Sequence, residues 1–513
     1  MKKLPIGLQD FGKLREGDYL YIDKTEQIHQ LLTGGGYYFL SRPRRFGKSL
    51  TLNTIKEIFR GRKELFKDLW IENNWDWSQT NPVIHIYFEA MGYKTKGLEK
   101  AISDFLQKTA KEHGLVLTEE TYEMQFLELL KAMHAKYGRE VVIIIDEYDK
   151  PLIDYLDDIP QARAHQKILK AFYSTFKSSD AHIRLLMITG VSRFSRVSIF
   201  SDLNNLLDIS QNHSYPDIVG YTQADLDHYF SDRMELAAQA NGLSFEALRA
   251  KIKLWYDGYT WDGKTEIYNP FSILCYFTDY QFVNHWFKTG TPTFLIKLLK
   301  ERMFYDFNNI IVEGTSFDSY DIEQLETEPL LFQTGYLTIK HIDKEYGLYT
   351  LTYPNLEVKE SMLSYLINAF SHRGNKEARS LVVQIALAFK QQNIAKVIDI
   401  LITIFADIPS HIFIAKKEAY YHSILHLVFT YLGQFIESEV NTSTGRIDSV
   451  VKIANYIYIF EFKLDSSAEI AFQQILTKNY AAKYRQLGKE IVGIGINFDS
   501  ALKTIDEWKM ENL

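Results

Sequence analysis

The sequence predicts an α/β protein in which a parallel sheet comes first, a mostly helical region follows and a second α/β domain comes last. Two observations predict this order. Over residues 1–214, short β-rich runs alternate with long helical patterns, which is typical of a parallel sheet with crossover helices. Over residues 411–513, several short apolar runs follow one another between two helical stretches.

Composition places the chain among ordinary globular proteins. Its 513 residues are 46% hydrophobic and 24% charged, which excludes a disordered or collagen-like chain. The net charge of −7 argues against non-specific coating of nucleic acid, so any nucleic-acid site must be a local patch. The single cysteine, Cys275, excludes an internal disulfide and fits a cytoplasmic location. No apolar run approaches the ~18 residues that a membrane span needs, so we expect no membrane contact.

The first domain, predicted at residues 1–214, is defined by its strands. They are expected at residues 37–40, 83–88, 141–145 and 183–189, with helices such as 50–59 and 123–136 between them. The run at 141–145 is wholly apolar, as expected of a parallel strand that is buried on both faces.

The rest of the chain is predicted in three parts. Residues 215–350 read as a helical lid or winged-helix-like region, and residues 351–410 as a helical connector with two helices between 374 and 413. The last part, 411–513, is expected to run through a helix at 420–434, strands at 436–441, 446–453 and 456–464, a helix at 466–487 and a strand at 491–497.

A candidate phosphate loop lies between the first strand and the next helix. It reads Ser41-Arg42-Pro43-Arg44-Arg45-Phe46-Gly47-Lys48-Ser49-Leu50. Lys48 would reach the β- and γ-phosphates of a nucleotide, the Ser49 hydroxyl would ligate Mg²⁺, and the loop and first-turn amides would face the phosphates. A Gly-Lys-Ser triplet also occurs by chance, and Arg42 stands where the motif has its first glycine. Its position between a strand and a helix favours the phosphate loop.

Two carboxylates at the end of the third predicted strand would complete the phosphate site with groups for Mg²⁺ and for the attacking water. Asp146 would hold Mg²⁺ through water, and Glu147 would polarise an attacking water. Thr189, at the end of the next strand, would contact the γ-phosphate or that water. The alternative for Asp146 and Glu147 is a solvated turn, but the two motifs together predict binding of ATP with Mg²⁺; hydrolysis is less well supported because the loop is irregular.

Two arginines follow the strand that ends near Thr189. Arg193 and Arg196 would sense phosphate or contact a partner. The alternative, two solvated arginines on a surface loop, fits the sequence equally well.

A second group of charged residues lies in the carboxyl-terminal part. If a hairpin turns at Ala454-Asn455, Asp448 lies opposite Glu461, and Lys463 shares the face of Glu461. Two adjacent carboxylates favour a bridging Mg²⁺ or Mn²⁺, which is suited to metal-assisted phosphodiester hydrolysis. The alternative is a cross-strand salt-bridge cluster.

Two helical pairs lie near these carboxylates in the sequence. Gln474 and Lys478 share a helix face and would reach the carboxylates or a nucleic-acid backbone. Glu418 and His422 form a similar pair, which more often makes a surface hydrogen bond than a metal site.

Motifs along most of the chain carry a resemblance to a known family. They are Leu4-Pro5-Ile6-Gly7, Tyr21-Ile22-Asp23-Lys24-Thr25, the loop from Arg42 to Ser49, Asp146-Glu147-Tyr148-Asp149-Lys150-Pro151, Trp255-Tyr256-Asp257-Gly258-Tyr259 and Tyr268-Asn269-Pro270-Phe271-Ser272. With them the chain resembles the bacterial AAA-ATPase-like family, in which an arginine at position 42 is usual. Gly445-Arg446-Ile447-Asp448 and Glu461-Phe462-Lys463, with Gln474 and Tyr480, resemble the PD-(D/E)XK nuclease domain fused to it.

The resemblance implies a P-loop NTPase sheet, a restriction-endonuclease-like last domain, and metal and catalytic roles for Asp448, Glu461 and Lys463. Ile447 replaces the proline of that motif. The sequence therefore predicts an ATP-binding, ATP-hydrolysing protein coupled to a metal-dependent nuclease that acts on DNA or RNA. Two alternatives stay open: a nucleotide-controlled switch with an inactive nuclease fold, and an ATPase that acts only as a remodelling motor, although no arginine finger is evident. Homo-oligomerisation is left open.

Overall fold

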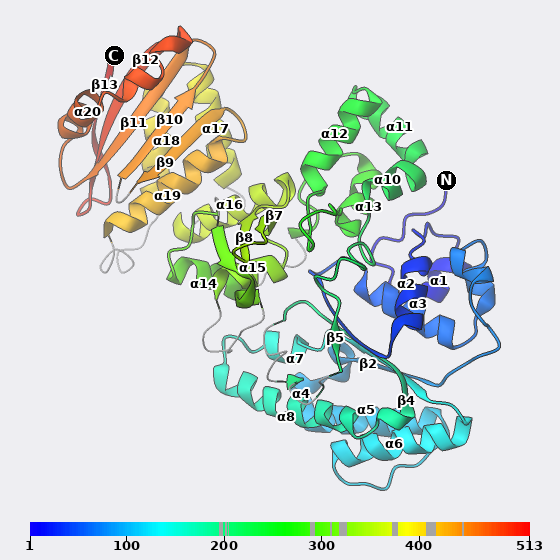
Figure 1. Ribbon diagram of the computed structural model, residues 1–513. Helices are drawn as coiled ribbons and strands as arrows, with labels where there is room; N and C mark the ends of the chain where they lie inside the picture. The colour runs from blue at the N-terminus through cyan, green and yellow to red at the C-terminus, as the bar shows by residue number, and fades with distance from the viewer. Residues whose placement is uncertain are drawn as a thin grey trace. The chain divides into compact units, whose positions relative to one another are not determined.

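The computed structural model describes residues 1–193, 199–200, 203, 205–287, 293–307, 310–317, 326–371, 378–406, 417–443 and 446–513 (Figure 1). The chain divides into two compact units, one of residues 1–290 with 308–357 and one of residues 291–307 with 358–513. Within the described ranges, no helix combines the length and the apolar character needed to cross a bilayer. The predicted α/β class, with a parallel sheet first and a mixed sheet last, is confirmed; the finer boundaries at residues 214, 350 and 410 stay predictions.

The first unit is built on a parallel sheet of five strands in the order β2-β3-β4-β1-β5. The strands are β1 Tyr37–Ser41, β2 Val83–Tyr87, β3 Val141–Asp146, β4 Ile183–Gly190 and β5 Leu207–Asp208. Four of them were predicted, and β5 has too few residues to show a pattern. The apolar residues of β3 are fully buried, as expected of a central strand.

Helices cover both faces of this sheet (Figure 1). They are α1 Phe11–Glu16, α2 Thr25–Gly34, α3 Lys48–Phe59, α4 Tyr93–Lys96, α5 Leu98–Glu112, α6 Tyr122–Tyr137, α7 Lys150–Ile153 and α8 Ile159–Lys177. Because the strands are parallel, their carboxyl ends meet at one edge: Ser41 pairs with Gly190, and Asp146 pairs with Tyr87. This edge carries the phosphate-loop residues and the strand-end carboxylates.

Gly190 shows how closely this edge is packed. A Cβ at this position would lie 2.5 Å from two ring carbons of Tyr148, a fully buried residue whose ring packs edge-on against Phe39. We therefore expect Gly190→Ala to lower the free energy of unfolding of this unit by about 1–3 kcal/mol, as overpacking of a core does. Gly36→Ala is the matched control, because its Cβ would have only the Arg184 carbonyl oxygen nearby, at 3.9 Å. Equal urea midpoints for both variants would contradict the prediction.

The helical region of the first unit contains α10 Gln223–Tyr229, α11 Ser231–Asn241, α12 Phe245–Tyr256, α13 Pro270–Asp279 and α15 Thr327–Gln333. Helices α10 to α13 pack around one core together with Leu20 and Ile22. Their sequence signals are clear: Thr222 and Asp225 form a capping box for α10, and Asn269 caps α13 directly before Pro270. Phe230 stacks on Phe277 at the centre of this core.

This region also contains an antiparallel sheet that the sequence did not predict. Its strands are β6 Ile310–Glu313, β7 Thr338–Asp343 and β8 Leu348–Thr352, in the order β6-β8-β7. The strands are short, and polar residues occupy positions that face solvent, so their apolar pattern is weak.

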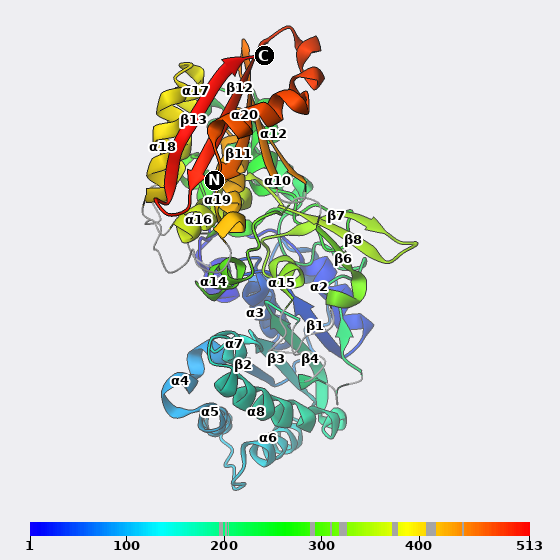
Figure 2. The same ribbon diagram turned by 90° about the vertical axis from the view of Figure 1, so that its left-hand side faces the viewer.

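The second unit places helices on both faces of a mixed sheet (Figure 2). The strands β9 Glu437–Ser443, β10 Arg446–Lys452, β11 Tyr456–Leu464, β12 Glu490–Asp499 and β13 Thr504–Asn512 lie in the order β13-β12-β11-β10-β9. The helices are α14 Thr293–Glu301, α16 Leu356–Ser371, α17 Ala378–Lys390, α18 Ile394–Ala406, α19 Lys417–Leu432 and α20 Ala468–Thr477. α17, α18 and α19 lie on one face and α20 lies on the other (Figures 1 and 2).

Two predictions for this unit were wrong. The helix expected at 466–487 ends at Thr477, and Asn479, with φ of 48°, turns the chain into two short 3-10 helices, Tyr480–Lys483 and Arg485–Leu487. β13 was missed because charged residues interrupt its apolar pattern, as is common in an edge strand.

Candidate functional site

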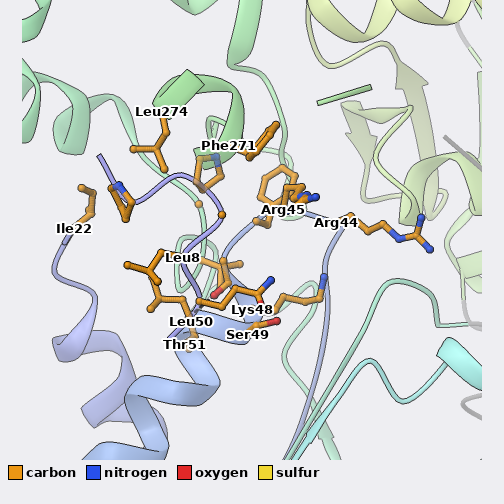
Figure 3. Close-up of a pocket in the computed structure, with 18 of the residues that line it drawn as sticks. Leu8, Ile22, Arg44, Arg45, Lys48, Ser49, Leu50, Thr51, Phe271 and Leu274 are labelled. Atoms are coloured by element: carbon orange, nitrogen blue, oxygen red, sulfur yellow. Dashed lines mark hydrogen bonds between the residues drawn. The ribbon is translucent and has the colours of Figure 1, made fainter. Parts of the chain in front are cut away.

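The first unit contains a cavity of about 370 Å³ at the carboxyl edge of its sheet. The lining residues come from the amino-terminal segment, the phosphate loop, the ends of β2 and β3, the segment before α10 and the start of α13. One part is polar, with Lys48, Ser49 and Glu147, and another is apolar, with Leu8 and Leu274. Figure 3 shows Lys48, Ser49, Leu50 and Thr51 at the start of α3, with Phe271 and Leu274 of α13 across the cavity.

The phosphate loop ends in a conformation that leaves helix amides available. Arg45 and Gly47 have φ of 70° and 96°, and α3 begins at Lys48 without a side-chain cap. The first helical hydrogen bond runs from the Thr51 amide to the Gly47 carbonyl, so the amides of the first turn lack helical acceptors. Such an end attracts anions.

Lys48 is held by the loop itself. Its Nζ donates to the carbonyl oxygens of Arg42 at 2.8 Å and Pro43 at 3.0 Å, and the side chain is buried. Burial lowers the pKa of the Lys48 ammonium, and the nearby Glu147 opposes this shift. An incoming phosphate would offer this ammonium a charged partner in place of two neutral carbonyls.

The strand-end carboxylates lie in different environments. Asp146 is buried, and its Oδ1 accepts a hydrogen bond from the Thr189 hydroxyl at 2.7 Å. Thr189 is therefore committed to Asp146, and neither residue lines the cavity. Glu147 does line it, with φ of 53°; burial raises the pKa of its carboxyl, while Lys48 opposes the rise.

Asp149 connects the segment after β3 to the segment after β4. Its carboxylate accepts hydrogen bonds from the Val191 amide and from the amide and hydroxyl of Ser192, the last at 2.6 Å. Asp149 is a structural member of the Asp-Glu-Tyr-Asp motif, and the sequence analysis had given it no role.

The arginines near the site differ from the sequence expectation. Arg42, which stands where the phosphate-loop motif has its first glycine, is buried beneath the ring of Trp261 at 4.1 Å and donates to the carbonyl oxygens of Ser41 and Ser210. It does not line the cavity, and burial lowers its pKa to about 9. Arg193 is also buried, 2.8 Å from the carboxylate of Asp208, so it is neither a solvated arginine nor a phosphate sensor in this conformation. Arg196 lies outside the described residues.

Arg44 and Arg45 remain at the cavity. Figure 3 shows the Arg44 side chain extending away from Lys48 and Ser49, and the Arg45 guanidinium lies over the Phe271 ring at 5.0 Å. Of these two arginines, Arg45 thus lies between the loop and α13.

Residues distant in the sequence support the loop, and sequence reasoning missed them. The Trp286 indole donates to the Arg44 carbonyl at 3.0 Å, and the Gly220 amide donates to the Phe46 carbonyl at 3.1 Å. The Phe46 ring packs edge-on against Tyr259. Only these long-range contacts reveal their role, although Tyr259 lies in a motif that carried the family resemblance.

Lys150 and Glu89 were also missed as cavity residues. Lys150 follows Glu147 by three positions, and its Nζ lies 2.6 Å from Asp154. Glu89 lies after β2 and accepts a hydrogen bond from the Tyr87 hydroxyl at 2.7 Å. The placement of Lys150 beside the strand-end motif was the only sequence signal for either residue.

A second candidate site lies on the sheet of the second unit. The predicted hairpin register is confirmed, because Asp448 of β10 pairs with Glu461 of β11. Glu461 is buried; its Oε1 accepts hydrogen bonds from Lys463 Nζ at 3.2 Å and from the amide of Gln474. Lys463 Nζ also donates to Gln474 Oε1 at 2.7 Å. Glu461, Lys463 and Gln474 therefore form one cluster, while the side chain of Asp448 lies outside the described residues.

Two glycines of β12 let α20 approach this sheet. A Cβ at Gly495 would lie 2.4 Å from the Ala468 carbonyl oxygen and 2.6 Å from the Phe472 amide nitrogen. At Gly493 a Cβ would meet the Phe472 ring at 2.9 Å. This close approach brings Gln474 to Glu461.

One described side chain at this site, Glu461, has the carboxylate oxygens that a hard divalent cation prefers. Glu461 offers a buried carboxylate, and the strand register brings the backbone of Asp448 opposite it. Among the described side chains, no group of three metal-ligating residues occurs, but the side chain of Asp448 is not one of them. The Glu418 side chain likewise lies outside the described residues, so its predicted pairing with His422 stays a prediction.

Comparison with known proteins assigns a family to each of the two regions that contain these candidate sites. A family model described as "Predicted AAA-ATPase" matches residues 5–200, and one described as "PD-(D/E)XK nuclease superfamily" matches residues 416–508. A protein of Azotobacter chroococcum mcd 1, named "Uncharacterized protein in vnfD 5'region", is 39% identical over 527 residues, covering 100% of this chain and 99% of that protein. The chain therefore belongs to the family of predicted AAA-ATPases with a carboxyl-terminal PD-(D/E)XK nuclease-superfamily domain.

Proposed function

We propose that the protein binds and hydrolyses ATP in the cavity of its first unit and cleaves nucleic-acid phosphodiester bonds with its carboxyl-terminal domain. The observation that carries the first part is the cavity itself, which joins the amino end of α3, Lys48 and Glu147 in one space. The observation that carries the second part is the cluster of Glu461 with Lys463 and Gln474.

In the first unit, different residues would bind the phosphates, the Mg²⁺ ion and the base of the nucleotide. The first-turn amides of α3 would bind phosphate oxygens, and Lys48 would exchange its carbonyl partners for phosphate. Ser49 would ligate Mg²⁺, and Asp146, which lies behind the cavity lining, would hold it through water, with the Thr189 hydrogen bond fixing the Asp146 carboxylate. Glu147 would accept the proton of the attacking water. The apolar part, with Leu8, Ile22 and Leu274 among its residues, would hold the base.

In the second unit, Asp448 and Glu461 would hold Mg²⁺ or Mn²⁺. When bound, such a cation supplies an activated water and stabilises charge on the phosphate. Lys463, held by Gln474, would stabilise the negative charge that develops on the phosphate oxygens. Gln474 would keep the Glu461 carboxylate in its orientation.

One observation favours the alternative of a nucleotide-controlled switch with an inactive nuclease fold. Both Lys463 and Gln474 donate to the same oxygen of Glu461, so that oxygen is already engaged without a cation. A carboxylate used in this way would serve structure rather than metal binding.

A cleavage assay tests the proposal: the full-length protein is incubated with supercoiled plasmid and Mn²⁺, with and without ATP. We expect nicked and linear products that require the divalent cation, and we expect labelled ATP to bind in a parallel measurement. ATP binding without cleavage under Mg²⁺ or Mn²⁺ would favour the switch, whereas cleavage without ATP binding would overturn the assignment of the cavity.

A further inference from the structure

A short segment of the second unit is strongly basic in an acidic chain. Residues 478–489 contain Lys478, Lys483, Arg485 and Lys489 and no carboxylate, although the net charge of the chain is −7. This basic segment begins directly after α20, the helix that brings Gln474 to Glu461.

In the basic segment, one aromatic side chain is buried in the core while the neighbouring cationic side chains are exposed to solvent. Tyr484 is buried in the core that also contains Ile457 and Ile459 of β11. Lys483 and Arg485, on either side of it, are exposed. The Lys478 ammonium lies 5.9 Å from the centroid of the Tyr480 ring and the Lys483 ammonium 5.3 Å from that of Tyr484, so aromatic rings help to place them.

Two lysines elsewhere in this unit show what pairing with a carboxylate looks like. Lys452 lies 2.6 Å from Glu437, and Lys509 lies 2.7 Å from Glu469. By contrast, neither Lys478 nor Arg485 forms an ion pair with any carboxylate in the described part of the chain. These two cations therefore remain available to an external anion.

The position of Lys478 connects the segment to the Glu461 cluster. Lys478 follows Gln474 by four residues, so the two side chains lie on the same helix face about 5–6 Å apart at their Cβ atoms. A polyanion that reached the Glu461 cluster would thus pass the first cation of the basic segment.

We propose that the basic segment, residues 478–489, is a docking surface for the sugar-phosphate backbone of a nucleic acid whose phosphodiester lies at the Glu461 cluster. This inference rests on the proposed nuclease function and assigns the surface that holds its substrate. Phosphate contacts of this kind position the strand without reading its sequence, and each contact releases counterions, so binding weakens as salt rises.

The double variant Lys478→Gln/Arg485→Gln tests the surface in the full-length protein. Fluorescence anisotropy with labelled 30-mers in EDTA measures binding without cleavage, with duplex DNA, single-stranded DNA and duplex RNA as separate arms. In the arm that binds best, we expect at least roughly tenfold weaker binding at 0.1 M salt. The slope of log K against log salt should fall by about 2 for a duplex, since each lost phosphate contact removes about 0.9.

Lys390→Gln/Lys396→Gln is the matched control, because it removes two exposed lysines of the same unit from α17 and α18. It should retain the affinity and salt slope of the parent protein. If the Lys478/Arg485 variant binds as tightly as this control, the docking surface is wrong, while metal-dependent plasmid cleavage would still uphold the nuclease function. If the parent protein binds none of the three nucleic acids, the docking surface is also wrong. The nuclease function is tested separately, and absence of metal-dependent plasmid cleavage would overturn it.

Discussion

Replacing Glu461 by glutamine should reduce metal-dependent phosphodiester cleavage by roughly 100-fold or more, since losing even a group that only supports a metal ligand costs about 10- to 100-fold. The substitution keeps the shape of a buried side chain but removes the negative charge that would bind Mg²⁺ or Mn²⁺. The glutamine oxygen can still accept hydrogen bonds from Lys463 and Gln474, so the fold of the second unit should be retained. Initial rates of plasmid nicking in Mn²⁺ measure the effect.

The control for this variant is Glu469→Gln, which removes a carboxylate from the exposed side of α20, where it pairs with Lys509. Its cleavage rate should equal that of the parent protein. Asp448→Ala should match the loss seen in Glu461→Gln, because the register places both residues at one site. Full cleavage by Glu461→Gln would show that the carboxylate serves only the structure of the sheet.

Replacing Lys48 by alanine should weaken ATP binding about 100-fold or more. A charged hydrogen bond contributes about 1.5–3 kcal/mol, and a 100-fold loss corresponds to about 2.7 kcal/mol. The fold should tolerate the change, because burial already disfavours the Lys48 ammonium, as its lowered pKa shows. Isothermal titration of the full-length protein with ATP and Mg²⁺ measures the affinity, and circular dichroism checks the fold.

Lys56→Ala serves as the comparison for Lys48→Ala. Lys56 lies on the same helix, α3, and pairs with Glu57 at 3.3 Å rather than with loop carbonyls. It should bind ATP as the parent protein does. An unchanged nucleotide affinity in Lys48→Ala would contradict the assignment of the phosphate loop.

Local patterns were sufficient for much of the framework. The wholly apolar run of β3 and the carboxylates that follow it identified a central parallel strand and its functional edge. The register of Asp448 with Glu461 was also predictable, because a tight hairpin leaves strand pairing little freedom once its turn is known. The apolar run with its carboxylates and the hairpin are each formed by residues close together in the sequence, so local patterns reveal them.

The failures have a common physical cause, which is competition from distant residues. Arg42 occupies a phosphate-loop position, yet Trp261 and the Ser210 carbonyl bury it. The helix expected at 466–487 ends early because Asn479 takes a left-handed conformation and Tyr484 packs under β11. Local propensity could not reveal either partner.

The sequence by itself determined the first four strands of the parallel sheet, the position of Gly47-Lys48-Ser49 at a strand–helix junction and the pairing of Asp448 with Glu461. Only the tertiary structure decided which polar side chains line the cavity: Lys48 and Glu147 do, while Arg42, Arg193 and Thr189 are bonded to the protein's own oxygens. The reason is that strand periodicity is a local property, whereas burial and hydrogen-bond partners depend on residues brought together by folding.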